Sequence, residues 1–147
     1  MDDFSATAVY PDVNKWLDNY VYVNTDFPIN PPTIGVATFD GSDALGNAYD
    51  NSNASNSGGC DTLTSKPVNL FGDAQGNLYL LSDSIWLTFF VERKGRGNPV
   101  ELSDSLIVEF YDKDLLTWTE VWGKRGGIND TVFSKIKIPI TDTKWLD

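Results

Sequence analysis

Hydrophobic and polar residues alternate along several short segments of this 147-residue chain. The clearest such segment is Asp104–Tyr111. Within it, Leu106, Val108 and Phe110 fall on one face of an extended strand. Ile85–Val91 is almost continuously hydrophobic. It predicts a central strand that is buried on both faces, or on one face with the other side covered.

Other short segments rich in β-branched and aromatic residues predict further strands, which are Tyr20–Val23, Thr33–Phe39, Thr62–Leu70, Trp118–Trp122 and Val132–Ile140. In the last segment we expect four side chains to face inward, those of Val132, Ile136, Ile138 and Ile140. No segment of ten or more residues keeps a 3.6-residue period, and neither an internal repeat nor a linker divides the chain. The pattern predicts one all-β domain over residues 1–147, a two-sheet antiparallel β-sandwich.

Composition excludes several functions. The 21 acidic and 11 basic residues give a net charge of −10, which disfavours binding to a nucleic-acid backbone. The chain has no His, so a Ser-His-Asp triad and a His-ligated zinc site are excluded. No stretch is long and apolar enough for membrane insertion.

A long polar loop, Ser42–Gly59, is the first candidate for a functional site. It and the preceding residue supply the oxygen-bearing side chains of Asp40, Asp43, Asn47, Asp50, Asn51 and Asn53. Calcium takes six to eight oxygen ligands, and we expect the metal ligands here to be Asp40, Asp43 and Asp50. The spacing matches no EF-hand, and a solvated loop of ordinary turn residues is the alternative.

Aromatic side chains suggest a second kind of site. Exposed rings stack on the apolar faces of sugars while nearby Asp and Asn side chains bind the hydroxyls. The possible platforms are Trp16, Tyr49, Trp118, Trp122 and Trp145. We expect ligand binding by Tyr49, Trp118, Asp50 and Asn53. Because Trp118 and Trp122 are four residues apart, a regular strand would place both on one face, although core packing is the better expectation for Trp86 and Trp122.

Catalysis by paired carboxylates has little support. The chain has only four Glu residues, which are Glu92, Glu101, Glu109 and Glu120. Glycoside hydrolysis needs two carboxyl groups on either side of the scissile bond, and no feature of the sequence selects such a pair. We therefore expect a protein that is not an enzyme.

Several blocks together carry a family resemblance. They are Asp2–Ser5, Pro31–Gly41, Asp61–Leu70, Leu87–Phe90 with Lys94-Gly95, Asp104–Leu106 and Trp118–Trp122. In this order they resemble the MAM-like (concanavalin A-like) jelly-roll modules of large secreted or surface proteins of Bacteroidetes-type bacteria. Many such proteins leave the cell by type IX secretion, and some serve gliding or adhesion. The resemblance runs from Asp2 to about Ile140.

The resemblance implies a jelly roll that acts as a non-catalytic extracellular binding or adhesion module, secreted or at the bacterial cell surface. Its partners would be a glycan or protein ligand and neighbouring domains. The alternatives are a carbohydrate-binding accessory domain of a secreted enzyme and a structural spacer, with a hydrolase least favoured. In such modules further strands follow the one at Val132–Ile140. We expect an excised or truncated module here, with its last strands missing or supplied by another chain.

Overall fold

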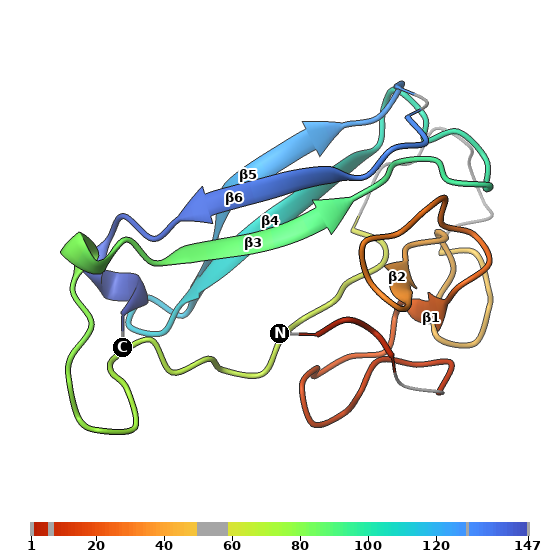
Figure 1. Ribbon diagram of the computed structural model, residues 1–147. Helices are drawn as coiled ribbons and strands as arrows, with labels where there is room; N and C mark the ends of the chain where they lie inside the picture. The colour runs from red at the N-terminus through yellow and green to blue at the C-terminus, as the bar shows by residue number, and fades with distance from the viewer. Residues whose placement is uncertain (1, 6–7, 50–58, 129, 147) are drawn as a thin grey trace. The chain divides into compact units, whose positions relative to one another are not determined.

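The computed structural model describes residues 2–5, 8–49, 59–128 and 130–146. These residues form six β-strands and two short 3-10 helices (Figure 1). Every strand pairing among them is antiparallel. No helix in the described ranges is long and apolar enough to cross a membrane. The predicted all-β class is confirmed, whereas the jelly-roll arrangement stays a prediction.

The chain groups into two compact units. The N-terminal unit contains Met1–Pro67 and Gly95–Gly97, and the C-terminal unit contains Val68–Lys94 and Asn98–Asp147. The single domain over residues 1–147 stays a prediction.

A short strand pair and the chain start organise the N-terminal unit. Strand β1 (Tyr22–Asn24) pairs with β2 (Val36–Thr38). The Gly35 N–H donates to the Asp3 carbonyl oxygen at 3.0 Å. A Cβ atom on Gly35 would lie 2.3 Å from the Phe4 carbonyl oxygen, so only glycine allows this close approach.

The predicted strand at Thr62–Leu70 is wrong, because only an isolated bridge between Ser65 and Trp16 forms there. The carboxylate of Asp18 accepts the Thr64 N–H at 2.9 Å, in place of a strand carbonyl. A side chain thus satisfies a main-chain donor that a sheet ladder would otherwise use.

Two strand pairs build the C-terminal unit (Figure 1). Strand β3 (Trp86–Val91) pairs with β6 (Ser134–Pro139), and β4 (Ser105–Asp112) pairs with β5 (Thr117–Arg125). The 3-10 helices η1 (Leu81–Asp83) and η2 (Thr143–Trp145) belong to the same unit and were not expected from the sequence.

One ring contact joins these two strand pairs, and a second joins β4 to η2. Phe89 of β3 meets Trp122 of β5 edge to face, with ring centroids 5.4 Å apart. Phe110 of β4 meets Trp145 of η2 in the same manner at 5.5 Å. Since β3–β6 and β4–β5 touch through these inward side chains, the C-terminal unit has a sandwich-like core.

Most of the inward positions were predicted correctly. Leu106, Val108 and Phe110 are all half-buried on one face of β4. Of the four positions expected at the end of the chain, Ile138 and Ile140 are buried and Ile136 is half-buried. The expectation for Val132 is wrong, because it precedes β6 and is 71% exposed.

Trp118 and Trp122 do not share a face, contrary to expectation. Val108 pairs with Trp122, but the next residue of β4, Glu109, pairs with Glu120. One residue of β5 is therefore left over at a β-bulge. The bulge reverses the alternation, so Trp122 points into the core while Trp118 points outward and is 52% exposed.

Strand β3 is covered on one face only. Phe89 contacts the core, whereas Trp86 and Phe90 are 51% and 43% exposed. The expectation that Trp86 packs in the core, and that Ile85–Val91 is covered on both sides, is therefore wrong. The continuous apolar pattern reflects an outer face that carries large aromatic side chains in contact with solvent.

The inward position of Ile138 predicts a large stability effect. Ile138 is 5% exposed on β6, whereas Ile107 is 45% exposed on the outer face of β4. We expect Ile138→Ala to lower the free energy of unfolding by about 2–4 kcal/mol, because it leaves a cavity in the core. The control Ile107→Ala should lower it by about 1 kcal/mol or less. Urea denaturation followed by Trp fluorescence measures both, and equal effects would contradict the assigned faces.

Candidate functional site

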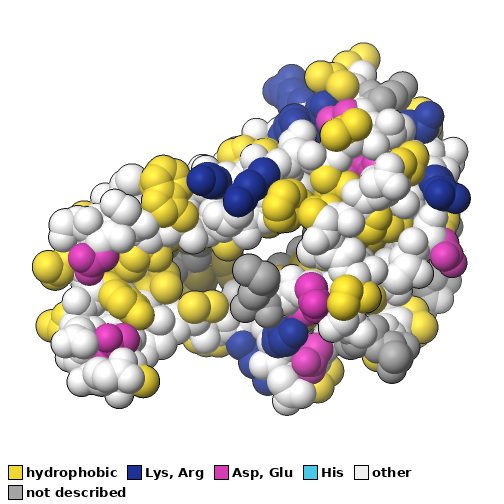
Figure 2. Space-filling view, viewed as in Figure 1, with side chains coloured by type: hydrophobic (Ala, Val, Ile, Leu, Met, Phe, Trp, Pro, Cys, Tyr) yellow, Lys and Arg dark blue, Asp and Glu magenta, His cyan; other side chains and the backbone are white. Residues whose placement is uncertain are grey.

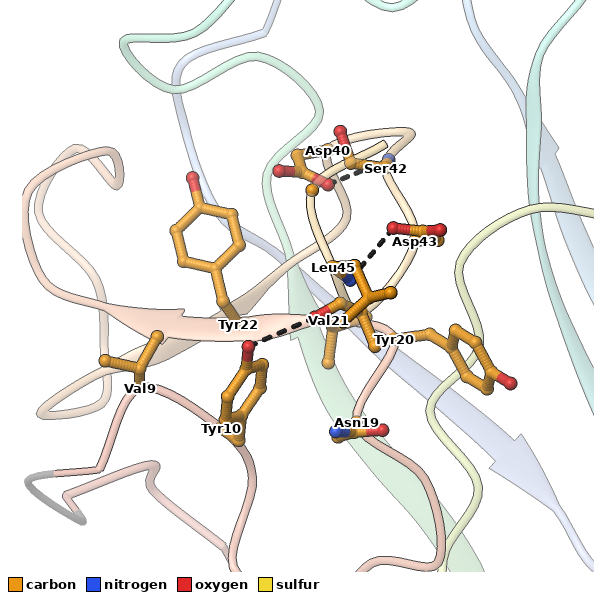
Figure 3. Close-up of a pocket in the computed structure, with 12 residues that line it drawn as sticks. Val9, Tyr10, Asn19, Tyr20, Val21, Tyr22, Asp40, Ser42, Asp43 and Leu45 are labelled. Atoms are coloured by element: carbon orange, nitrogen blue, oxygen red, sulfur yellow. Dashed lines mark hydrogen bonds between the residues drawn. The ribbon is translucent and has the colours of Figure 1, made fainter. Parts of the chain in front are cut away.

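A pocket of about 450 Å³ lies in the N-terminal unit between the approach to β1 and the loop after β2 (Figure 3). The first side contributes Val9, Tyr10, Asn19, Tyr20, Val21 and Tyr22, and the loop contributes Asp40 and Ser42–Gly46. Its volume is in the range of small-molecule sites. Three tyrosine rings, an amide and two carboxylates line one hollow.

Several polar groups of this pocket form no hydrogen bond with the residues that the structure describes. Within the described part of the chain, the hydroxyls of Tyr20 and Tyr22 and the amide of Asn19 make no hydrogen bond. Asp40 accepts one bond at Oδ1 from the Ser42 N–H at 3.0 Å, which leaves Oδ2 free. These donors and acceptors are available to a polar ligand.

The electrostatics of the pocket centre on Tyr22 and Asp40. Partial burial, followed by the nearby negative charge of Asp40, raises the pKa of Tyr22 above its ordinary value. Tyr22 therefore stays protonated at neutral pH and can donate a hydrogen bond. Tyr10 is fixed differently, because its hydroxyl donates to the Ala44 carbonyl oxygen at 3.2 Å and ties the two sides of the pocket together.

The loop holds its shape through Asp43. Its Oδ1 atom accepts the N–H groups of Leu45 and Asn47, both at 2.8 Å, and the Asn47 side-chain amide donates to Oδ2 at 3.2 Å. The Asp43 N–H in turn donates to the Asn47 carbonyl oxygen at 2.8 Å. These bonds, first those from Asn47, lower the pKa of Asp43 below its ordinary value. Asp43 therefore shapes the pocket wall.

The second unit repeats this loop, which sequence analysis missed. Asp73–Tyr79 matches Asp43–Tyr49 at five of seven positions, with Asp, Ala, Gly, Asn and Tyr in the same places. Asp73 Oδ1 accepts the N–H groups of Gln75 and Asn77, both at 2.9 Å, and the Asn77 side chain donates to Oδ2 at 2.8 Å. The shared motif, D-A-x-G-N-x-Y, was the signal that could have revealed the turn.

Only some of the predicted site residues line the pocket. Asp40 and Asp43 both line the pocket. Asp50 and Asn53 lie outside the described residues. Trp118 belongs to the C-terminal unit and is not a pocket residue.

Tyr49, the predicted aromatic platform, follows the Asp43 turn and is 36% exposed. Burial of its hydroxyl, and then its hydrogen bond to the Asp61 carboxylate, raise the pKa of Tyr49. Asp61 Oδ2 accepts the Gly41 N–H at 2.9 Å and so holds the start of the loop.

Calcium binding by Asp40, Asp43 and Asp50 stays a prediction. Among the residues that the structure describes, no three His, Cys, Asp or Glu side chains gather into a group that could hold a metal ion. Both oxygens of Asp43 accept hydrogen bonds from the loop, Oδ1 from the Leu45 N–H at 2.8 Å and Oδ2 from the Asn47 side chain at 3.2 Å.

Comparison with protein families, curated proteins and solved structures found no match to this chain. The resemblance to MAM-like jelly-roll modules therefore stays a prediction that rests on the blocks quoted from the sequence.

The two matched turns predict the same titration behaviour. The pKa values of Asp43 and Asp73 are both lowered, with Asn47 and Asn77 as the main causes. A depressed carboxyl pKa stabilises the folded turn above the unfolded pKa, and this contribution is lost as the pH falls through the folded pKa. We expect NMR titration to place both carboxyl groups below the ordinary value of 3.8.

Removing one donor provides an internal control. In Asn47→Ala, the side-chain bonds to Asp43 are lost, so the Asp43 pKa should rise toward its ordinary value while that of Asp73 stays unchanged. A pKa of Asp43 that does not respond would contradict the assigned hydrogen bonds.

Proposed function

We propose that this chain is a non-catalytic binding module that takes a carbohydrate group in the pocket of its N-terminal unit. The observation that carries the proposal is the set of unpartnered polar groups beside tyrosine rings: the hydroxyls of Tyr20 and Tyr22, the amide of Asn19 and the free oxygen of Asp40. Sugars present hydroxyl groups and apolar ring faces together, and this combination of side chains complements both.

The size of the pocket supports a small ligand. About 450 Å³ accommodates one or two sugar rings. Because Tyr22 keeps its proton, its hydroxyl can donate to a sugar oxygen while Asp40 accepts from a sugar hydroxyl. A charged acceptor makes a stronger hydrogen bond than a neutral one, so Asp40 is the group expected to orient the ligand.

We infer the location of the protein from the resemblance of its sequence to MAM-like jelly-roll modules. MAM-like jelly-roll modules belong to secreted or surface proteins, so we place the chain at the bacterial cell surface or outside the cell as a binding or adhesion module. As an accessory domain of a secreted enzyme it would hold that enzyme on its polysaccharide. A spacer that binds no ligand is the competing proposal.

A glycan array probed with the whole chain tests this function. We expect Tyr22→Phe and Asp40→Asn each to weaken binding of the best glycan by about fivefold or more, because each removes one hydrogen bond to the ligand. Titration calorimetry with that glycan measures the change. The matched control Tyr79→Phe alters a tyrosine of the C-terminal unit outside the pocket and should leave the affinity unchanged.

Two outcomes would redirect the assignment. Loss of binding in Trp118→Ala, with normal binding in Tyr22→Phe, would move the glycan site to the outer face of β5. An unmodified chain that binds no glycan on the array would favour the spacer.

A further inference from the structure

The outer face of β4–β5 carries an acidic row beside an aromatic row. Its cross-strand pairs are Ser105 with Arg125, Ile107 with Gly123, Glu109 with Glu120, and Tyr111 with Trp118, so one basic residue lies at the Ser105 end of the face. The rings of Tyr111 and Trp118 lie 5.1 Å apart and are 45% and 52% exposed. Two glutamates directly opposite each other repel, which destabilises the strand pair unless a cation approaches.

The outer face of β3–β6 carries the opposite charge. Its cross-strand pairs are Trp86 with Pro139, Thr88 with Lys137, and Phe90 with Lys135. The ammonium group of Lys135 lies 5.8 Å from the centre of the Phe90 ring. Figure 2 shows basic side chains beside hydrophobic ones over these two strands.

Among the described residues, the charged side chains of these rows form no ion pair. No ion pair among the described residues involves Glu109 or Glu120. The same holds across the described ranges for Lys135 and Lys137, although the chain holds 21 acidic residues that could pair with them. Each face thus presents aromatic area and uncompensated charge to solvent.

We propose that this chain associates with further copies of itself, with the outer face of β4–β5 in one copy docked on the outer face of β3–β6 in the next. Glu109 and Glu120 then lie against Lys137, with Lys135 one row further along β6, and the exposed aromatic side chains of the two faces cover one another. The partner is a second copy because the same chain carries both the acidic face of β4–β5 and the basic face of β3–β6.

The spacing of the two faces agrees with such a contact. Residues two apart on a strand are separated by roughly 7 Å, which is also the distance between neighbouring rows. On β4–β5 the Glu109–Glu120 row and the Tyr111–Trp118 row are neighbours. On β3–β6 the row that contains Lys137 and the row that contains Trp86 are neighbours as well. When the acidic row meets the Lys137 row, the Tyr111–Trp118 row can therefore lie over Trp86.

The geometry determines the kind of assembly. Phe89 and Trp122 meet between the two strand pairs, so the acidic and basic faces point away from each other. A contact between different faces is heterologous, and repeated docking gives an open stack. Each face is only two strands wide. The area that it can bury is therefore below the roughly 800 Å² per partner of a standard interface, and a single contact is weak. Modules held close together at a surface would gain from the high local concentration.

Sedimentation velocity of the whole chain at increasing concentration tests the proposal. We expect the unmodified chain to form species larger than a monomer at low salt. Raising the salt from about 50 mM to about 500 mM shortens the Debye length from roughly 14 Å to roughly 4 Å and should dissociate them. This measurement needs no variant, so it does not depend on how a substitution affects folding.

Charge reversal then tests the faces. The variant Glu109→Lys/Glu120→Lys carries basic charge on both faces, and Lys135→Glu/Lys137→Glu carries acidic charge on both. We expect each alone to associate at least about tenfold more weakly than the unmodified chain, since like charges now meet. An equal mixture of the two should regain association. The control Glu101→Lys/Asp114→Lys changes the net charge by the same amount at exposed positions outside both faces and should associate normally.

Three results would overturn the proposal. The first is an unmodified chain that stays monomeric at every concentration at low salt. The second is a control variant that loses association as strongly as the two face variants. The third is a loss confined to one face variant, or a mixture that does not regain association, because either would mean that the two faces do not meet each other.

Discussion

One extra residue in β5 decides what the C-terminal unit presents on each side. Between the pairs Val108–Trp122 and Glu109–Glu120 the register shifts, and the alternation of β5 reverses. Trp122 can then reach Phe89 in the core, while Trp118 joins Tyr111 on the outside. Without the bulge one face of β5 would carry both tryptophans, because side chains alternate with a period of two. The core contact and the outer aromatic row therefore depend on the same local irregularity.

The two units each contain a tight turn held by the same pattern of hydrogen bonds. In each, an Asp carboxylate accepts two main-chain N–H groups and the side-chain amide of an Asn four residues later. A glycine with positive φ, Gly46 or Gly76, completes the reversal because it carries no Cβ. In the N-terminal unit this turn also forms a wall of the pocket, so a self-contained local structure holds Asp40 and Ser42 near the tyrosines.

The two proposals separate by unit and by chemistry. The N-terminal pocket offers neutral donors, one free carboxylate oxygen and tyrosine rings, which suit a polar, uncharged ligand. The outer faces of the C-terminal unit offer rows of charge next to exposed rings, which suit a flat partner with the complementary pattern. Under these two proposals, the N-terminal unit holds a ligand and the C-terminal unit holds neighbouring copies.

The sequence by itself determined the strand content and most of the inward positions, because alternation in β4 and β6 is a local property of the chain. It also singled out Asp40 and Asp43, which both line the pocket. It did not predict the exposure of Trp86, since a run of apolar residues looks the same whether one face or both are buried. The faces of Trp118 and Trp122 depend on a bulge, and within Thr62–Leu70 the Asp18 side chain accepts a main-chain N–H that a strand partner would otherwise accept. Tertiary structure decided these points, because each depends on which groups meet across strands that are distant in sequence.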